Sequence, residues 1–184
     1  MKRAVIIHCW GGSSHYAWYP WAKTELEKRG YQVTVPDMPN TDEPQYSEWL
    51  HTLQEVIGEP DDELLLIGHS LGTVTIMRYL ESLPADTRIR KAILVAGFTD
   101  QLGFSELESF FETRIDFARV KPKALEGFVA IQSDSDPFVS RQYGNRLQQE
   151  LGAELVIKHG ANHMSGPADG EGACVELPEL LESL

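Results

Sequence analysis

The stretch Gly68-His69-Ser70-Leu71-Gly72 has the residue types and spacing of a nucleophile turn, G-x-S-x-G. A serine hydroxyl held at a sharp turn between a strand and a helix stands clear to attack an acyl carbonyl. The turn brings the flanking chain so close that side chains at 68 and 72 would collide, which explains the two glycines. The competing interpretation is an ordinary turn that contains a serine, and the strand and helix expected on either side weaken it.

A second glycine-rich turn, His8-Cys9-Trp10-Gly11-Gly12, follows the first apolar segment. Attack on a carbonyl creates an oxyanion, which needs two N–H donors aimed at the same oxygen. We expect these donors to be the backbone N–H groups of Trp10 and Leu71, because both turns follow buried strands. The alternative for Trp10 is a plain tight turn whose side chain packs against the core.

A serine hydroxyl also needs a base to take its proton and an acid to orient that base. His163 is the candidate base, because it lies in a loop of small residues after the last expected strand. Asp136 is the candidate acid, in a turn that follows the preceding strand. Asp134 in the same turn is the competitor, since such turns often contain Asp for local capping alone.

The remaining histidines have less suitable positions. His159 lies at the end of a strand, where a structural hydrogen bond is the simpler role. His69 precedes the serine but must point away from the open side of the turn. The others are also less well placed: His8, His15 and His51.

Aromatic residues are dense near the expected site. Candidate walls of a pocket for the acyl or leaving group are Trp18, Trp21, Phe138 and Met164. For either tryptophan alone, packing of a helix on a sheet is the simpler role.

Strands that alternate with helices must position these side chains. Apolar runs predict six strands, at 4–7, 31–35, 64–67, 91–95, 127–132 and 154–158. Helical patterns fall between and after them, at 14–28 with Ser14 as cap, 47–57, 73–83, 140–151 and 175–184. This alternation predicts an α/β fold with a parallel, doubly wound sheet. All the candidate residues would then lie at its carboxyl edge, where such sheets bind ligands.

The stretch 102–120 predicts one or two amphipathic helices with an exposed charged face. Because it follows the carboxyl end of a strand, it would either overhang the site as a small lid or form the next crossover helix. A loose acidic loop is expected at 167–172.

Composition narrows the class of protein. The 184 residues are expected to form one domain, 1–184, and the net charge of −12 argues against nucleic acid or anionic membrane partners. Cys9 and Cys174 show no zinc-ligand spacing, and no metal or organic cofactor is expected. No apolar run suits a signal sequence or a membrane span, so we expect a cytoplasmic protein.

Several segments together resemble a known family: A-V-I-I-H-C-W-G-G, W-Y-P-W-A-K-T-E-L-E-K-R-G, D-M-P-N, I-G-H-S-L-G, S-D-S-D-P-F-V and G-A-N-H. They cover nearly the whole chain, which resembles the small serine hydrolases of the retinoblastoma-binding protein nine and YdeN type. The resemblance implies a compact three-layer α/β/α hydrolase fold without a large cap, and it favours Asp136 over Asp134. It also implies esterase- or amidase-type activity on small substrates.

The chemistry predicted is hydrolysis of carboxylic esters or small amides through an acyl-enzyme intermediate. Ser70 would be the nucleophile, His163 the base and then the acid, and Asp136 the residue that orients His163. The alternative is a non-catalytic or weakly catalytic protein-interaction module on the same fold, suggested by the acidic surface and the aromatic cluster at 16–21.

Overall fold

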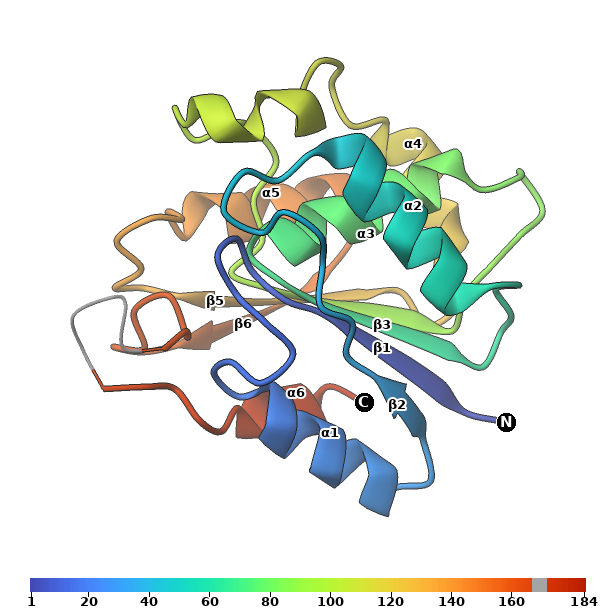
Figure 1. Ribbon diagram of the computed structural model, residues 1–184, viewed down its shortest axis with the longest axis horizontal. Coiled ribbons are helices and arrows are strands. Elements are labelled where there is room, and N and C mark those ends of the chain that lie inside the picture. The colour runs from blue at the N-terminus through green and yellow to red at the C-terminus, as the bar shows by residue number, and fades with distance from the viewer. Residues whose placement is uncertain (167–171) are drawn as a thin grey trace.

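A computed structural model of the protein describes residues 1–166 and 172–184, so the loop expected at 167–172 lies outside the described residues except for Gly172. Six parallel strands form one sheet in the order β2-β1-β3-β4-β5-β6 (Figure 1). The strands are β1 (Arg3–Ile7), β2 (Gln32–Thr34), β3 (Leu64–His69), β4 (Lys91–Val95), β5 (Phe128–Ser133) and β6 (Glu154–Lys158).

The strand sequences explain their places in the sheet. Every residue of β3 and β5 is buried, as expected for parallel strands that are covered on both faces. The short strand β2 alternates exposed and buried residues and forms one edge, as its sequence predicts. The six predicted strands are therefore all present, each within a residue or two of its expected limits.

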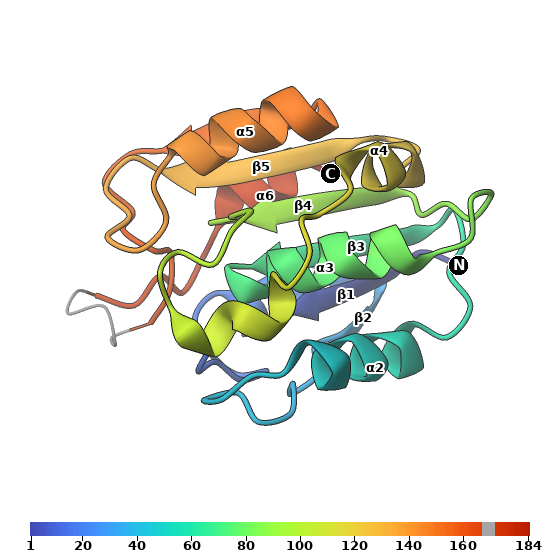
Figure 2. The same ribbon diagram turned by 90° about the horizontal axis from the view of Figure 1, so that it is seen from above.

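Helices cover both faces of the sheet (Figures 1 and 2). One face carries α1 (Tyr19–Lys28) and α6 (Pro178–Glu182). The other face carries α2 (Tyr46–Ile57), α3 (Leu71–Ser82), α4 (Phe117–Val120) and α5 (Gln142–Leu151). A separate apolar core lies on each side of the sheet, so the predicted three-layer α/β/α arrangement is confirmed.

The predicted start of the first helix was wrong. Residues 13–18 form turns, and α1 begins only at Tyr19, with Pro20 in its first turn. Ser14 does not cap the helix, because the helix starts at Tyr19 and Trp18 occupies the N-cap position. The backbone N–H of Ser14 donates to Asp37 Oδ1 at 2.6 Å. The last helix is also shorter than predicted and comprises only α6.

The stretch 102–120 is not a continuous amphipathic helix. It contains a 3₁₀ helix, η1 (Ser105–Phe110), and then the single-turn helix α4, which is followed by η2 (Lys121–Lys123). The buried guanidinium of Arg78 on α3 donates to the backbone carbonyls of Phe110 and Thr113. These bonds fix the end of η1 against α3, since a buried guanidinium must find acceptors for its N–H groups.

Candidate active site

Ser70 lies on the turn between β3 and α3 with a left-handed backbone, φ +53° and ψ −116°. The two glycines permit this turn. A Cβ at Gly68 would lie 2.7 Å from the carbonyl carbon of Gly72, and one at Gly72 would collide with the carbonyl oxygen of Ile7. The steric reason predicted for both glycines is therefore present in the structure.

His163 and Asp136 meet as a buried pair. Nδ1 of His163 lies 2.8 Å from Asp136 Oδ2, and the carboxylate side chain has no exposed area. Asp136 Oδ1 accepts the backbone N–H groups of Phe138 and Val139, each at 2.9 Å. Since the carboxylate acts as an acceptor throughout, the arrangement favours the imidazole tautomer with its proton on Nδ1 and a free lone pair on Nε2.

Asp134 belongs to a different pair. Its Oδ2 lies 2.6 Å from His159 Nδ1, and its Oδ1 accepts the Gly160 N–H at 2.8 Å. The hydrogen bond from Gly160 and then the one from His159 lower the pKa of the Asp134 carboxyl. The His159 side chain is 82% exposed, so this pair lies on the surface and ties the turn after β5 to the loop after β6.

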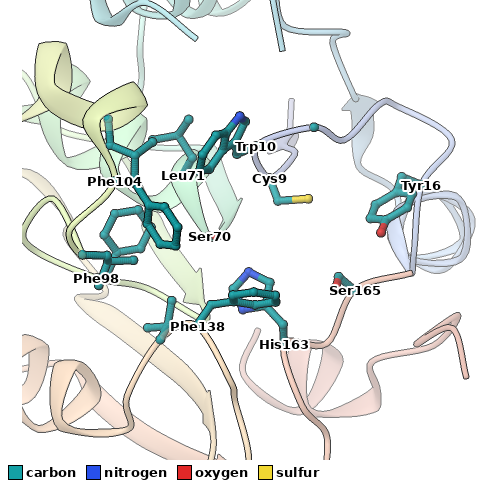
Figure 3. A pocket seen from close by; sticks show the side chains of 14 residues that line it. Cys9, Trp10, Tyr16, Ser70, Leu71, Phe98, Phe104, Phe138, His163 and Ser165 are labelled. Atoms are coloured by element: carbon teal, nitrogen blue, oxygen red, sulfur yellow. The ribbon is translucent and has the colours of Figure 1, made fainter. Parts of the chain in front are cut away.

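Ser70 and His163 line the same cavity, of about 270 Å³, at the carboxyl edge of the sheet (Figure 3). Both are largely buried, with exposed fractions of 8% and 7%. Among the contacts described for residues 1–166 and 172–184, no hydrogen bond joins the Ser70 hydroxyl to the imidazole. The structure thus brings the three predicted residues to one edge, as a buried His163–Asp136 pair and a serine across a shared cavity.

The two residues predicted to supply the oxyanion donors, Trp10 and Leu71, both line this cavity. Leu71 is the first residue of α3, so its N–H has no acceptor within the helix, and the helix dipole favours negative charge there. The backbone N–H groups of Gly11 and Gly12 donate to the carbonyls of Thr41 and Cys9, and the indole N–H of Trp10 donates to the Asp42 carbonyl, whereas no hydrogen bond of the described residues uses the backbone N–H of Trp10.

The family model for serine hydrolases matches residues 4–174 of the chain. The chain belongs to the serine hydrolase family. YdeN of Bacillus subtilis (strain 168) is 32% identical over 165 residues, which cover 89% of this chain and 86% of YdeN. Serine hydrolase RBBP9 of Rattus norvegicus is 27% identical over 158 residues, covering 83% and 82% of the two chains.

Solved structures agree with this membership. The crystal structure of the ydeN gene product from B. subtilis superimposes with a TM-score of 0.90 at 29% identity, covering 99% of this chain and 96% of that one. A YdeN-like hydrolase from Pectobacterium atrosepticum has the same fold, with a TM-score of 0.66 at 17% identity and coverage of 99% and 89%. The resemblance predicted from the sequence segments is therefore confirmed.

The cavity of this serine hydrolase has an apolar wall that the sequence analysis did not assign. This wall comes from the segment that runs from the end of β4 into η1. Its residues are Phe98, Leu102, Phe104 and Leu107. Phe104 contacts Trp10 edge to face, with ring centroids 5.6 Å apart. The sequence did contain a signal for this wall, since Phe104 and Leu107 belong to the periodic apolar residues of the stretch 102–120. The start of that stretch walls the site, while α4 packs between α3 and α5.

Three of the four predicted pocket residues do not line the cavity. Trp18 is fully buried on the α1 side of the sheet, where its ring contacts Tyr19 and His69. Trp21 packs against the same core, and Met164 is fully buried within it. These three side chains point away from the cavity, because α1 and the loop after β6 contribute them to the core on the face of the sheet opposite to α3.

Phe138 does line the cavity of the serine hydrolase, and its ring packs edge-on against His163 with centroids 5.2 Å apart. Tyr16 and Ser165 line it as well, on the side away from Phe98 and Phe104 (Figure 3). Tyr16 was part of the aromatic cluster in the sequence, whereas no pattern indicated Ser165.

Within residues 1–166 and 172–184, no group of three or more His, Cys, Asp or Glu side chains could hold a metal ion. Over the same ranges, no helix has the length and apolar character needed to cross a membrane.

Proposed function

We propose that this serine hydrolase cleaves carboxylic esters or small amides through an acyl-enzyme intermediate on Ser70. The proposal depends on one observation: Ser70 and the Asp136-paired His163 face the same small cavity. An imidazole whose Nδ1 proton is held by a buried carboxylate leaves Nε2 to accept a proton from a hydroxyl.

In the first step, Ser70 Oγ attacks the substrate carbonyl carbon while His163 Nε2 takes the hydroxyl proton. The Oγ–Nε2 hydrogen bond forms as substrate binds, since catalytic hydrogen bonds often tighten only in the bound complex. The carbonyl oxygen becomes an oxyanion and receives the N–H groups of Leu71 and Trp10. Asp136 stabilises the imidazolium that this step creates.

The tetrahedral intermediate then collapses. The bond from the carbonyl carbon to the leaving oxygen or nitrogen breaks, and the leaving group takes the proton from His163. A water molecule next attacks the acyl-enzyme as His163 accepts its proton. Expulsion of Ser70 Oγ, which regains that proton, releases the carboxylic acid and restores the enzyme.

The two sides of the cavity suggest how a substrate would lie. His163 protonates the leaving group, so that group is placed toward the loop after His163, where Tyr16 and Ser165 supply polar atoms. The acyl group then points toward the apolar wall with Phe98 and Phe104 (Figure 3). We therefore expect apolar acyl groups and more polar leaving groups.

A fluorophosphonate probe tests the proposal directly, because it reacts with activated serine hydroxyls. We expect the wild-type protein to be labelled, with the adduct located on Ser70 by peptide mass spectrometry, and Ser70→Ala to be unlabelled. Ser140→Ala, which removes an exposed serine outside the cavity, is the matched control and should be labelled like the wild type. A folded wild-type protein that neither reacts with the probe nor hydrolyses esters would refute the proposal.

The alternative of a protein-interaction module loses much of its support. It drew on the aromatic cluster at 16–21, but Trp18 and Tyr19 have no exposed area and are unavailable to a partner. The acidic net charge alone indicates no particular binding surface.

A further inference from the structure

His69 is fully buried beneath the nucleophile and has no part in the mechanism above. Both of its ring nitrogens are nevertheless bound. Nδ1 lies 2.7 Å from the hydroxyl oxygen of Tyr19, and Nε2 lies 2.8 Å from the backbone carbonyl oxygen of His163. The Tyr19 hydroxyl is also 3.1 Å from the backbone nitrogen of Cys9.

The direction of each hydrogen bond follows from the partners. A carbonyl oxygen can only accept, so His69 Nε2 carries the proton and Nδ1 carries the lone pair. The Tyr19 hydroxyl therefore donates to Nδ1, and its oxygen accepts the Cys9 N–H. Burial lowers the pKa of His69 to about 3 and raises the pKa of Tyr19 well above its ordinary value, so neither group is charged at neutral pH.

This chain of bonds joins the parts of the site that must stay aligned. Cys9 precedes the oxyanion donor Trp10, His69 precedes Ser70, and His163 carries the proton. The Tyr19 hydroxyl connects the segments of Cys9 and His69, and it does so from the α1 face of the sheet, opposite to α3. Neither Tyr19 nor His69 lines the cavity, so both act at a distance from any substrate.

The loop that holds His163 needs such support. Asn162 and Met164, on either side of it, both have left-handed backbones, with φ of +47° and +53°. A positive φ is unfavourable for a residue other than glycine and persists only where the surroundings fix it. The bond from His69 fixes the carbonyl between them, and the rings of His69 and His163 lie 5.1 Å apart.

We propose that His69 and Tyr19 are positioning residues that hold the backbone of His163 and the oxyanion turn in register with Ser70. This inference rests on the proposed function, because it concerns the alignment of the groups assigned there. Displacement of a catalytic group by about 1 Å can lower the rate by roughly 100-fold, so the link matters for turnover.

Two substitutions of His69 separate its two bonds. In His69→Gln the longer side chain places an amide N–H near the position of Nε2, where it can still donate to the His163 carbonyl. In His69→Asn the shorter side chain places its amide near Nδ1, where it can meet Tyr19 but not His163. Both variants are uncharged and lose the ring; since Asn also lacks a methylene that Gln keeps, kcat is compared per folded molecule.

We expect His69→Asn to lower kcat for a simple ester by roughly 10- to 100-fold, with KM changed by no more than about twofold. His69→Gln should keep kcat within about fivefold of the wild type, because it restores the bond to His163. Equal kcat values for the two variants would overturn the role of His69. A merely structural role would lower the folded fraction of both variants and leave kcat per folded molecule unchanged.

Tyr19→Phe tests the other end of the chain and keeps the test decisive if His69→Asn fails to fold. We expect roughly a 10-fold lower kcat, since the Cys9 N–H loses its acceptor next to the oxyanion turn. Tyr31→Phe is the matched control, because it removes a hydroxyl bound to Arg90, neither of which lines the cavity, and should keep wild-type kcat. Wild-type kcat in Tyr19→Phe would refute its positioning role.

The fate of the Ser70→Ala variant distinguishes the two proposals. If that variant keeps full activity, the proposed function fails whatever the His69 variants do. If it is inactive while His69→Asn and Tyr19→Phe turn over like the wild type, only the positioning role fails.

Discussion

At the scale of single residues, chemically identical groups in this protein occupy opposite environments. Asp134 and Asp136 are two residues apart in one turn, yet they bind different histidines on different sides of it. The Asp136 carboxylate is wholly buried, whereas the His159 side chain bound to Asp134 is 82% exposed. Of these four residues only His163 lines the cavity, so the environment separates the roles of the two aspartates.

This difference predicts unequal effects of the same substitution. Asp136→Asn should lower kcat by roughly 100- to 10,000-fold, because an amide no longer holds the Nδ1 proton of His163 and no longer stabilises the imidazolium. Asp134→Asn is the control at a matched position, and we expect kcat within about twofold of the wild type. Steady-state kinetics with one ester would decide, and similar losses in both variants would contradict the assignment of Asp136.

The buried His69 predicts how stability depends on pH. Desolvation, followed by the charge interaction with His163, lowers its pKa to about 3 in the folded protein. An unfolded chain protonates this group below about pH 6.5, so the unfolded state binds more protons between pH 6.5 and 3. The free energy of unfolding contributed by His69 is therefore complete above pH 6.5 and is lost as the pH falls.

Urea unfolding at pH 7 and pH 4 measures this effect. The loss of stability between the two pH values should be smaller in His69→Gln than in the wild type by about 1–3 kcal/mol. His51→Gln, which removes an exposed histidine on α2, is the control and should lose as much as the wild type. An equal loss in His69→Gln would show that His69 is not buried and neutral.

At the scale of elements, the unit β3–turn–α3 determines where the nucleophile lies. Gly72, in the first turn of α3, lies directly against the carboxyl end of β1, so the helix start, the nucleophile and the oxyanion turn share one close contact. The two glycines are therefore needed for the close contact between α3 and β1 as well as for the turn at Ser70.

Gly72→Ala tests this contact. Its Cβ would collide with the Ile7 carbonyl and lie 2.9 Å from the His8 carbonyl. We expect the free energy of unfolding to fall by at least about 1–3 kcal/mol, because no backbone atom there can move cheaply. Gly172→Ala would place its Cβ more than 4 Å from every described residue beyond its chain neighbours and should leave the stability unchanged. A stable Gly72→Ala protein, measured by chemical denaturation, would contradict the close approach.

The stretch 102–120 is the part of the chain whose role the sequence pattern left ambiguous. The stretch 102–120 has helical periodicity, but its first part turns into η1 and walls the cavity, with Arg78 fixing its end. The choice between a lid and a crossover helix was open in the sequence because both bury the same apolar side chains. In the structure the start of the stretch lines the cavity, while α4 packs against α3 and α5.

At the scale of the whole molecule, the cavity is small, and residues 1–166 and 172–184 place no large cap over the carboxyl edge of the sheet (Figure 2). Its size of about 270 Å³ is at the lower end for small-molecule sites. Phe104, 37% exposed, forms part of the rim of its apolar side. These features favour short apolar acyl groups.

A series of acyl esters of graded chain length tests this expectation. We expect kcat/KM to be highest for short acyl chains and to fall for long ones that exceed the cavity. Phe104→Ala should raise KM for the preferred ester about fivefold, because roughly 1 kcal/mol of apolar contact is lost. Leu125→Ala, which removes an exposed apolar side chain before β5, is the control. A preference for long chains would contradict the inferred acyl side.

The sequence by itself determined the order of strands and helices, the nucleophile turn with its two glycines, and the family of the chain. These features depend on apolar periodicity and local sterics, which neighbouring residues encode. The residue pattern left Asp134 and Asp136 open and only the family resemblance favoured Asp136, which the tertiary structure pairs with His163. Tertiary structure alone decided that Phe98 and Phe104 wall the cavity and that Trp18 does not. It also joined His69 and Tyr19 to the loop of His163. Such pairings depend on how segments far apart in the chain meet across the sheet, and this geometry is set by strand register and core packing.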